Sequence, residues 1–153
     1  MVIAGFFAFL LTLSTIFALL EIQIEGKNGW ASSLPCWKIE KGWFVHYFWG
    51  GRPLTGYHLY LNLFELMFLH FPLFFTAWSW RFECLILGFL LAMWQIEDFL
   101  WFVLNPNFGL KKFKPEYIPW HPGWTGPVPT CYWGYPVAWA PLIFLGLPIL
   151  TSR

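Results

Sequence analysis

Long apolar runs alternate along this chain with stretches rich in tryptophan, glycine and proline. The first run, residues 2–20, carries no charged side chain, and Gly5 is its only helix-weakening residue. About 20 apolar residues in an α-helix cross a hydrocarbon core of about 30 Å. A cleaved signal peptide would need a basic segment before this run and a small-residue cleavage site after it, and the run has neither. We therefore predict a transmembrane helix over residues 2–20.

Three later apolar runs predict three further membrane helices, over residues 55–80, 84–104 and 135–150. Pro72 lies inside the first of them and removes a backbone hydrogen bond, which predicts a kink. The run over residues 84–104 stops before Pro106, because a proline pushes the preceding residue out of the helical conformation. The run over residues 135–150 is short for a span and rich in proline. A re-entrant element is the alternative there, but a span is favoured.

These elements predict one all-α membrane domain over residues 1–153, a polytopic bundle of about four transmembrane helices. The short connection between the second and third helices predicts an antiparallel hairpin. Two long structured loops rich in tryptophan, glycine and proline, roughly 21–54 and 105–134, then share one face of the bundle. Since no predicted span contains a Gly-x-x-x-Gly motif, we expect the helices to associate through aromatic packing and polar contacts.

Composition supports a lipid environment. Hydrophobic residues make up 58% of the chain and charged residues 11%, against about 25% charged residues in a typical soluble domain. This balance excludes a soluble domain and a disordered chain. A net charge of +1 leaves no basic footprint for a nucleic acid. The predicted partner is the lipid bilayer, and the many tryptophans fit its interfaces.

The distribution of basic residues predicts the orientation. Cytoplasmic loops carry an excess of lysine and arginine, so we expect the long loops to be cytoplasmic and both termini to be outside. A disulfide between Cys36 and Cys131, one in each long loop, would favour an oxidising compartment on that side instead. Seven basic residues lie in the long loops, Lys27, Lys38, Lys41, Arg52, Lys111, Lys112 and Lys114, and two lie on the other side, Arg81 and Arg153.

Polar and ionisable side chains inside the predicted spans are the strongest functional signal, because such groups are costly in a membrane. At 100° per residue they fall on defined helical stripes. The second helix carries one stripe, and the third carries two adjacent ones. The stripes contain His58, Asn62 and Glu65 on the second helix, Gln95, Asp98 and Asn105 on the third, and Glu97 beside them.

Two of the carboxylates should lie at the same depth in the membrane. Glu65 follows His58, where the second helix begins, by seven residues, and Asp98 precedes Asn105, where the third helix ends, by seven. Seven residues correspond to about 10 Å of helix. We therefore expect both carboxylates below the face that the long loops cover, with His121 of the second long loop folding over them.

The predicted group of two histidines and two carboxylates, His58, Glu65, Asp98 and His121, has the ligand types that Zn, Fe or Mn prefer. A divalent metal there would activate a water molecule. Glu65, Glu97 and Asp98 are also candidate catalytic carboxylates. Two alternatives stay open, a polar site without metal and purely structural pairing of the acids with Arg52 or loop lysines.

Two function classes follow from this site. The first is an enzyme that acts on a lipid or another apolar substrate at the interface, with the carboxylates serving as metal ligands or as a general base. The second is non-catalytic, a small transporter, a channel or an accessory subunit of a larger membrane complex, with the same carboxylates binding a proton or cation. Assembly as a homo-oligomer is compatible with both. The chain has no Gly-x-Ser-x-Gly motif, so a serine hydrolase of that type has no support.

Overall fold

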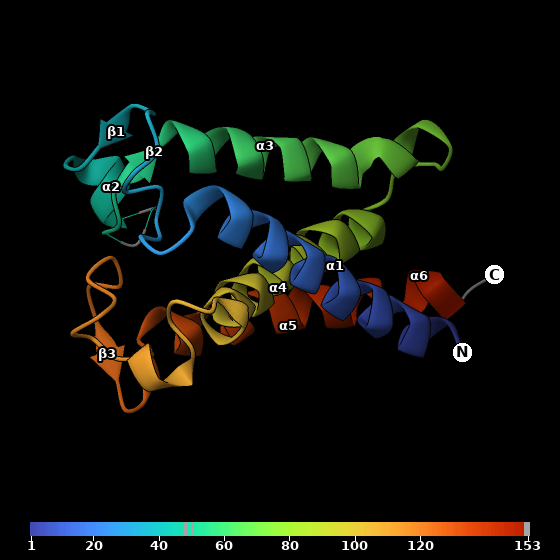
Figure 1. The fold of residues 1–153 in the computed structure, drawn as a ribbon. Helices are drawn as coiled ribbons and strands as arrows, with labels where there is room; N and C mark the ends of the chain where they lie inside the picture. Colours follow the sequence, from blue (N-terminus) through green and yellow to red (C-terminus); the bar gives the residue numbers. More distant parts are fainter. Residues whose placement is uncertain (48, 50, 152–153) are drawn as a thin grey trace.

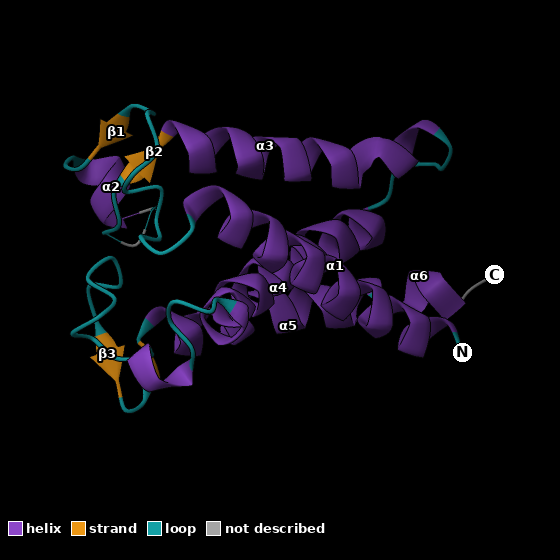
Figure 2. Cartoon of the chain, in the orientation of Figure 1, coloured by secondary structure: helices purple, strands orange, loops and turns teal. Residues whose placement is uncertain are grey.

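A computed structural model describes residues 1–47, 49 and 51–151. Most of these residues are helical, and the strands are two residues long (Figure 2). The long helices run between two ends of the molecule (Figure 1). One end carries the two long loops, and the other carries the described parts of both termini. This arrangement agrees with the predicted all-α bundle and with both loops lying on one face.

The first helix, α1 (Val2–Glu25), is longer than the predicted span. Its buried positions repeat every three or four residues, which forms one stripe that faces the bundle. The prediction stopped at residue 20 because the apolar run stops there. Glutamate is a good helix former, however, so the helix continues through Glu21 and Glu25. The stripe consists of Leu10, Ser14, Ala18, Ile22 and Glu25.

The second predicted span is shorter than expected. Helix α3 (Gly56–His70) has 15 residues, which rise only about 22 Å. Thr55 caps its start by accepting a hydrogen bond from the backbone N–H of His58. The α-helix ends before Pro72, and a 3₁₀ turn, η1 (Phe71–Phe74), follows. By length and composition α3 is not among the candidate spans, so the prediction of four spans is supported only in part.

Helix α4 (Trp80–Leu104) forms the centre of the bundle and packs against α1 and against α5 (Cys131–Gly146). It runs opposite to α3 (Figure 1), as a hairpin requires. The predicted stop is confirmed, since Asn105 leaves the helical conformation. After α5 the chain continues through α6 (Pro148–Thr151). The last candidate span therefore covers Cys131–Thr151, which exceeds the predicted 135–150.

Two glycines allow α4 and α5 to approach closely. A Cβ atom at Gly146 would lie 2.6 Å from Cβ of Leu85, and one at Gly88 would lie 2.8 Å from Cγ1 of Ile143. The helices therefore associate through single small residues as well as through aromatic packing and polar contacts. Sequence inspection for a Gly-x-x-x-Gly motif missed this because each helix contributes one glycine.

A proline in α5 leads to a polar contact between α4 and α5. Pro136 has no N–H, so the carbonyl of Tyr132 one turn earlier lacks its usual helical donor. Nε2 of Gln95 donates to that carbonyl at 3.0 Å, and Oε1 of Gln95 accepts from the indole N–H of Trp139 at 2.7 Å. Gln95 therefore holds α4 to α5, as polar side chains in membrane helices often do.

The two long loops contain short elements that cover one end of the bundle. The first loop includes β1 (Lys38–Ile39), helix α2 (Trp43–Tyr47) and β2 (Leu54–Thr55), and β1 pairs with β2. The second loop includes the 3₁₀ turn η2 (Leu110–Lys112), β3 (Trp124–Thr125) and β4 (Val128–Pro129), and β3 pairs with β4. In Figure 1 the two sets lie above and below the ends of α1 and α4.

Within the part of the chain that the structure describes, three helical segments are long and apolar enough to cross a membrane, Val2–Glu25, Trp80–Leu104 and Cys131–Thr151. Large apolar side chains project outward from them, as lipid contact requires. Phe144 and Val137 on α5 are about three-quarters exposed, and Phe9 and Leu11 on α1 are more than half exposed. The protein therefore has the features of an integral membrane protein.

Candidate functional site

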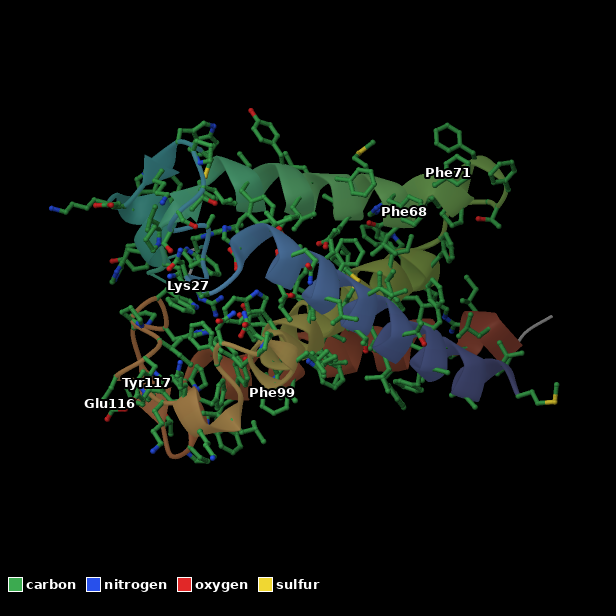
Figure 3. The ribbon with its side chains drawn as sticks, viewed as in Figure 1. Lys27, Phe68, Phe71, Phe99, Glu116 and Tyr117 are labelled. Carbon is green, nitrogen blue, oxygen red and sulfur yellow. The ribbon has the colours of Figure 1, made fainter. Side chains whose placement is uncertain are left out.

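A cavity of about 770 Å³ lies at the loop end of the molecule, between α1, α3, α4 and α5 and under both long loops. Figure 3 shows nitrogen and oxygen atoms concentrated in this half, with Glu116 and Tyr117 at its outer edge, while Phe68 and Phe71 lie toward the opposite end. Its ionisable lining residues come from six segments of the chain. They are Glu21, Glu25, Tyr47, Arg52, His58, Glu65, Glu97, Asp98, His121, Cys131 and Tyr135.

Asp98 of α4 is the centre of one half of the cavity. Its Oδ1 lies 3.5 Å from Nη1 of Arg52, and its Oδ2 lies 3.3 Å from Nε2 of His121. This second contact is not aligned as a hydrogen bond, so it is a close electrostatic contact between the imidazole and the carboxylate. The hydroxyl of Tyr132 also donates to Oδ2. Asp98 thus connects α4, α5 and both long loops.

Cys131 lies beside this group, at the first residue of α5. Its sulfur lies 3.2 Å from Nη2 of Arg52 and 3.8 Å from Nδ1 of His121. Cys131, His121 and Asp98 therefore form a continuous chain of contacts from a thiol through an imidazole to a carboxylate. Positive groups and a helix N-terminus both favour the thiolate form of a cysteine, which is the nucleophilic form.

Asp98 favours the charged form of both basic groups beside the thiol, His121 and Arg52. Burial alone would lower the pKa of His121, but the neighbouring Asp98 carboxylate raises it above its usual value. Burial likewise opposes the charge of Arg52, and Asp98 outweighs it, so the pKa of this guanidinium is raised. Arg52 also lies 4.9 Å from the ring centre of Trp30, a cation–π contact. A charged guanidinium is therefore held over the thiol.

His58 lies in the other half of the cavity. Its Nδ1 is 2.7 Å from Oγ1 of Thr55, and its Nε2 is 3.6 Å from Oε1 of Glu25. The ring stacks on Trp30, with ring centres 4.1 Å apart. Thr55, the helix cap, therefore also orients this imidazole toward the carboxyl group of α1.

The turn after α1 holds Trp30 in place. Trp30 and Ala31 have φ angles of 46° and 49°, which are uncommon for residues other than glycine. Two hydrogen bonds stabilise this turn, from the backbone N–H of Ala31 to Glu25 and from the indole N–H of Trp30 to the carbonyl of Pro53. The turn therefore sets the indole between His58 and Arg52.

The remaining acids form a carboxyl cluster, which we define as Glu21, Glu25, Glu65 and Glu97. The hydroxyl of Tyr57 donates to Oε1 of Glu21 at 3.3 Å. Glu21 and Glu97 lie within hydrogen-bonding reach of each other across α1 and α4. Two carboxyl groups this close repel each other strongly when both are ionised, because little water reaches them.

Most of the predicted site residues do meet in this one cavity. His58, Asn62, Glu65, Glu97, Asp98 and His121 all line it. Gln95 and Asn105 are structural instead. Gln95 ties α4 to α5, and Nδ2 of Asn105 donates at 2.8 Å to the carbonyl of Gly26, just past the end of α1. Both satisfy backbone carbonyls that have lost their helical partners.

The predicted metal ligands do not converge. His58 faces Glu25, Glu65 accepts from the indole N–H of Trp94 at 2.5 Å, and Asp98 faces His121. Within the described residues, no group of three or more histidine, cysteine, aspartate and glutamate side chains is arranged to hold a metal ion. The metal site therefore gains no support and stays a prediction.

Sequence reasoning missed six ionisable residues of the cavity as members of the site, namely Glu21, Glu25, Tyr47, Arg52, Cys131 and Tyr135. It placed the two glutamates in a loop, treated Arg52 as a possible structural partner, and considered Cys131 for a disulfide with Cys36. Both cysteines are free in the structure. The sequence did offer one signal for Cys131, because this cysteine lies only ten residues after His121, at the point where a loop leads into a helix.

Comparison of the chain with protein-family models, with curated proteins and with solved structures yields no match.

Proposed function

We propose that this protein is a membrane enzyme in which Cys131 is the nucleophile and the substrate is an acyl ester of a lipid or another apolar molecule. The observation that carries the proposal is the contact chain Cys131–His121–Asp98, with Arg52 beside the sulfur, inside a cavity. A thiol that approaches an imidazole, which approaches a carboxylate, is the arrangement that nucleophilic catalysis requires.

The first half of the reaction transfers the acyl group to the enzyme. The Cys131 thiolate attacks the ester carbonyl carbon, and the carbon–oxygen bond to the leaving group breaks. Protonated His121 gives its proton to the leaving alkoxide, so an alcohol departs and a thioester on Cys131 remains. The guanidinium of Arg52, 3.2 Å from the sulfur, is the nearest fixed charge that can stabilise the oxyanion.

The second half restores the enzyme. His121, now neutral, takes a proton from water as that water attacks the thioester carbonyl. The carbon–sulfur bond breaks, a carboxylic acid leaves, and the thiolate and imidazolium form again. Asp98 orients the imidazole and balances its charge, so we assign it a positioning role, whereas the sequence had indicated a metal ligand or general base.

The membrane setting supports an apolar substrate. The cavity lies at one end of three helices that are long enough to span, and its lining includes Leu61, Leu91 and Phe102. Seven of the nine basic residues belong to the loops that cover it. We therefore propose that the loops are cytoplasmic, where thiols stay reduced, which a thiol nucleophile needs.

Acyl-enzyme trapping tests the proposal. Full-length protein in detergent is mixed with a long-chain p-nitrophenyl ester, and nitrophenol release and intact protein mass are followed. We expect a burst of nitrophenol and an added acyl mass that maps to Cys131. Cys131→Ser should abolish both signals.

Cys36→Ser and Cys84→Ser are the matched controls, and both should keep the burst. Acylation that persists in Cys131→Ser would reject the proposal. Proton or cation flux in vesicles that Glu65→Gln abolishes, together with no acylation of the wild type, would favour the non-catalytic alternative instead.

A further inference from the structure

The carboxyl cluster occupies the part of the cavity that the proposed acyl chemistry does not use. Glu25 and Glu65 are each 5% exposed, and Glu21 and Glu97 also line the cavity. Among the described residues, the only arginine or lysine paired with a cavity carboxylate is Arg52, and its partner is Asp98. The cluster therefore holds several acids without a matching cation, which is costly in a buried site.

The partners that the cluster does have are neutral or weakly basic. Tyr57 donates to Glu21, Trp94 donates to Glu65, and His58 lies 3.6 Å from Glu25. Burial alone lowers the pKa of an imidazole, so His58 is a poor permanent counter-charge. These contacts satisfy some oxygen atoms but supply no lasting positive charge.

On the α4 side of the carboxyl cluster, two buried polar atoms have no hydrogen-bond partner among the described residues. Oε1 of Glu97 is buried and makes no hydrogen bond. The indole N–H of Trp101 is also buried and unpaired, on a side chain that is only 4% exposed and lines the same cavity. Trp101 follows Glu97 by four residues, so both lie on one stripe of α4. An acceptor and a donor on one stripe of α4 therefore lack partners among the described residues, although buried polar groups are nearly always paired.

We propose that the carboxyl cluster binds the protonated amine of an amino-alcohol head group on the lipid substrate. The ammonium donates to Glu97 and Glu21, and the indole N–H of Trp101 donates to the neighbouring hydroxyl oxygen. The indole ring of Trp94 adds a surface that attracts a cation. This inference rests on the proposed function, because it names the substrate class for the same cavity.

An organic ammonium fits the spacing of these acids better than a metal ion does. A metal needs three or more ligands at about 2 Å from one point, and no described group of three has that arrangement. An ammonium group reaches separate oxygens with separate N–H donors. The cavity of about 770 Å³ also lies within the range of about 300–1,000 Å³ that small-molecule sites occupy.

Direct binding to an inactive variant tests this inference without relying on turnover. Cys131→Ser protein in detergent is titrated calorimetrically with 2-amino-1-dodecanol and with 1,2-dodecanediol, its neutral match. We expect the amino alcohol to bind at least about tenfold more tightly, since the buried acids gain a counter-charge. Equal affinities would overturn the inference.

Variants locate the binding. Glu97→Gln in the Cys131→Ser background should weaken the binding of the amino alcohol at least about tenfold and leave the affinity for the diol unchanged. Trp101→Phe should weaken the binding of 2-amino-1-dodecanol but not the binding of dodecylamine, which has no hydroxyl group. Glu116→Gln, an exposed loop change, is the control and should have no effect. Thermal unfolding checks that each variant is folded, and Glu21→Gln replaces Glu97→Gln if that variant does not fold.

Three further outcomes separate the proposals. Loss of amino-alcohol binding when Mn²⁺ alone is added at stoichiometric concentration would assign the cluster to a metal and overturn the inference. Tight amine binding without acylation of Cys131 in the wild type would reject the proposed reaction and retain the ammonium site. Acylation without amine preference would do the reverse.

Discussion

The guanidinium of Arg52 lies 3.2 Å from the sulfur of Cys131, although 79 residues separate them along the chain. The same guanidinium is 3.5 Å from the carboxylate of Asp98. Arg52 is only 8% exposed, so little water weakens its charge. The arginine therefore places a permanent positive charge beside a thiol at a helix start, and this relationship underlies the first prediction.

Replacing Arg52 by glutamine should slow the reaction of Cys131 with iodoacetamide about tenfold near neutral pH, because less of the thiol is then ionised. The measurement is the rate of mass addition at Cys131 in the detergent-solubilised protein. Lys38→Gln, a change on an exposed strand, should leave this rate unchanged. An unaltered rate in Arg52→Gln would show that the guanidinium does not activate the thiol.

His121 should make stability depend on pH. Burial opposes its charge, but Asp98 raises its pKa above the usual value, which is about 6.5. The folded state therefore binds the proton more tightly, and this stabilisation is complete below about pH 6.5 and is lost as pH rises through the higher folded pKa. Cys131 and Arg52 also face the ring, with opposite effects on its charge.

We therefore expect His121→Gln to lower the unfolding temperature more at pH 6 than at pH 9. Thermal unfolding in detergent at both values, beside the wild type, measures the difference. His46→Gln, in the exposed part of α2, is the comparison and should show the same small effect at both values. A larger decrease in the unfolding temperature at pH 9 than at pH 6 would contradict a raised pKa of His121 in the folded state.

Close packing of α4 on α5 predicts that a single methyl group at Gly146 is harmful. The added Cβ would lie 2.6 Å from Cβ of Leu85 and 2.7 Å from its backbone nitrogen. We expect Gly146→Ala to destabilise the protein by about 1–3 kcal/mol, since overpacked helices must move apart. Gly5→Ala is the matched control, because nothing lies within 4 Å of its added methyl group. Equal stabilities of the two variants in chemical denaturation would refute the packing argument.

The role of Gln95 can be tested with a double-mutant cycle. Gln95→Leu should cost about 1–3 kcal/mol, because the buried carbonyl of Tyr132 loses its donor. Pro136→Ala restores the backbone N–H that this carbonyl would accept from. The loss from Gln95→Leu should therefore be smaller in a Pro136→Ala background. Additive effects of the two changes would show that Gln95 does not replace the missing helical hydrogen bond.

The polar stripes of α3 and α4 were predictable because they depend on local spacing. His58 and Glu65, or Glu97 and Asp98, are fixed relative to each other by helix geometry alone. Their meeting in one cavity followed from an equal-depth argument that needed only the helix ends. Metal ligation failed to gain support because it depends on side-chain direction to within a fraction of an ångström, and each acid or histidine found a different nearby partner.

The sequence by itself determined that this protein has helices long and apolar enough to span a membrane, and that the helix before Pro106 ends at Leu104. Hydropathy and proline positions are properties of single segments, so a one-dimensional pattern reveals them. Only the tertiary structure decided that Arg52, His121 and Cys131 surround Asp98, and that α1 carries Glu21 and Glu25 into the same cavity. Loop residues have no periodicity, and helix packing alone brings distant segments together, so their chemistry became visible only after folding.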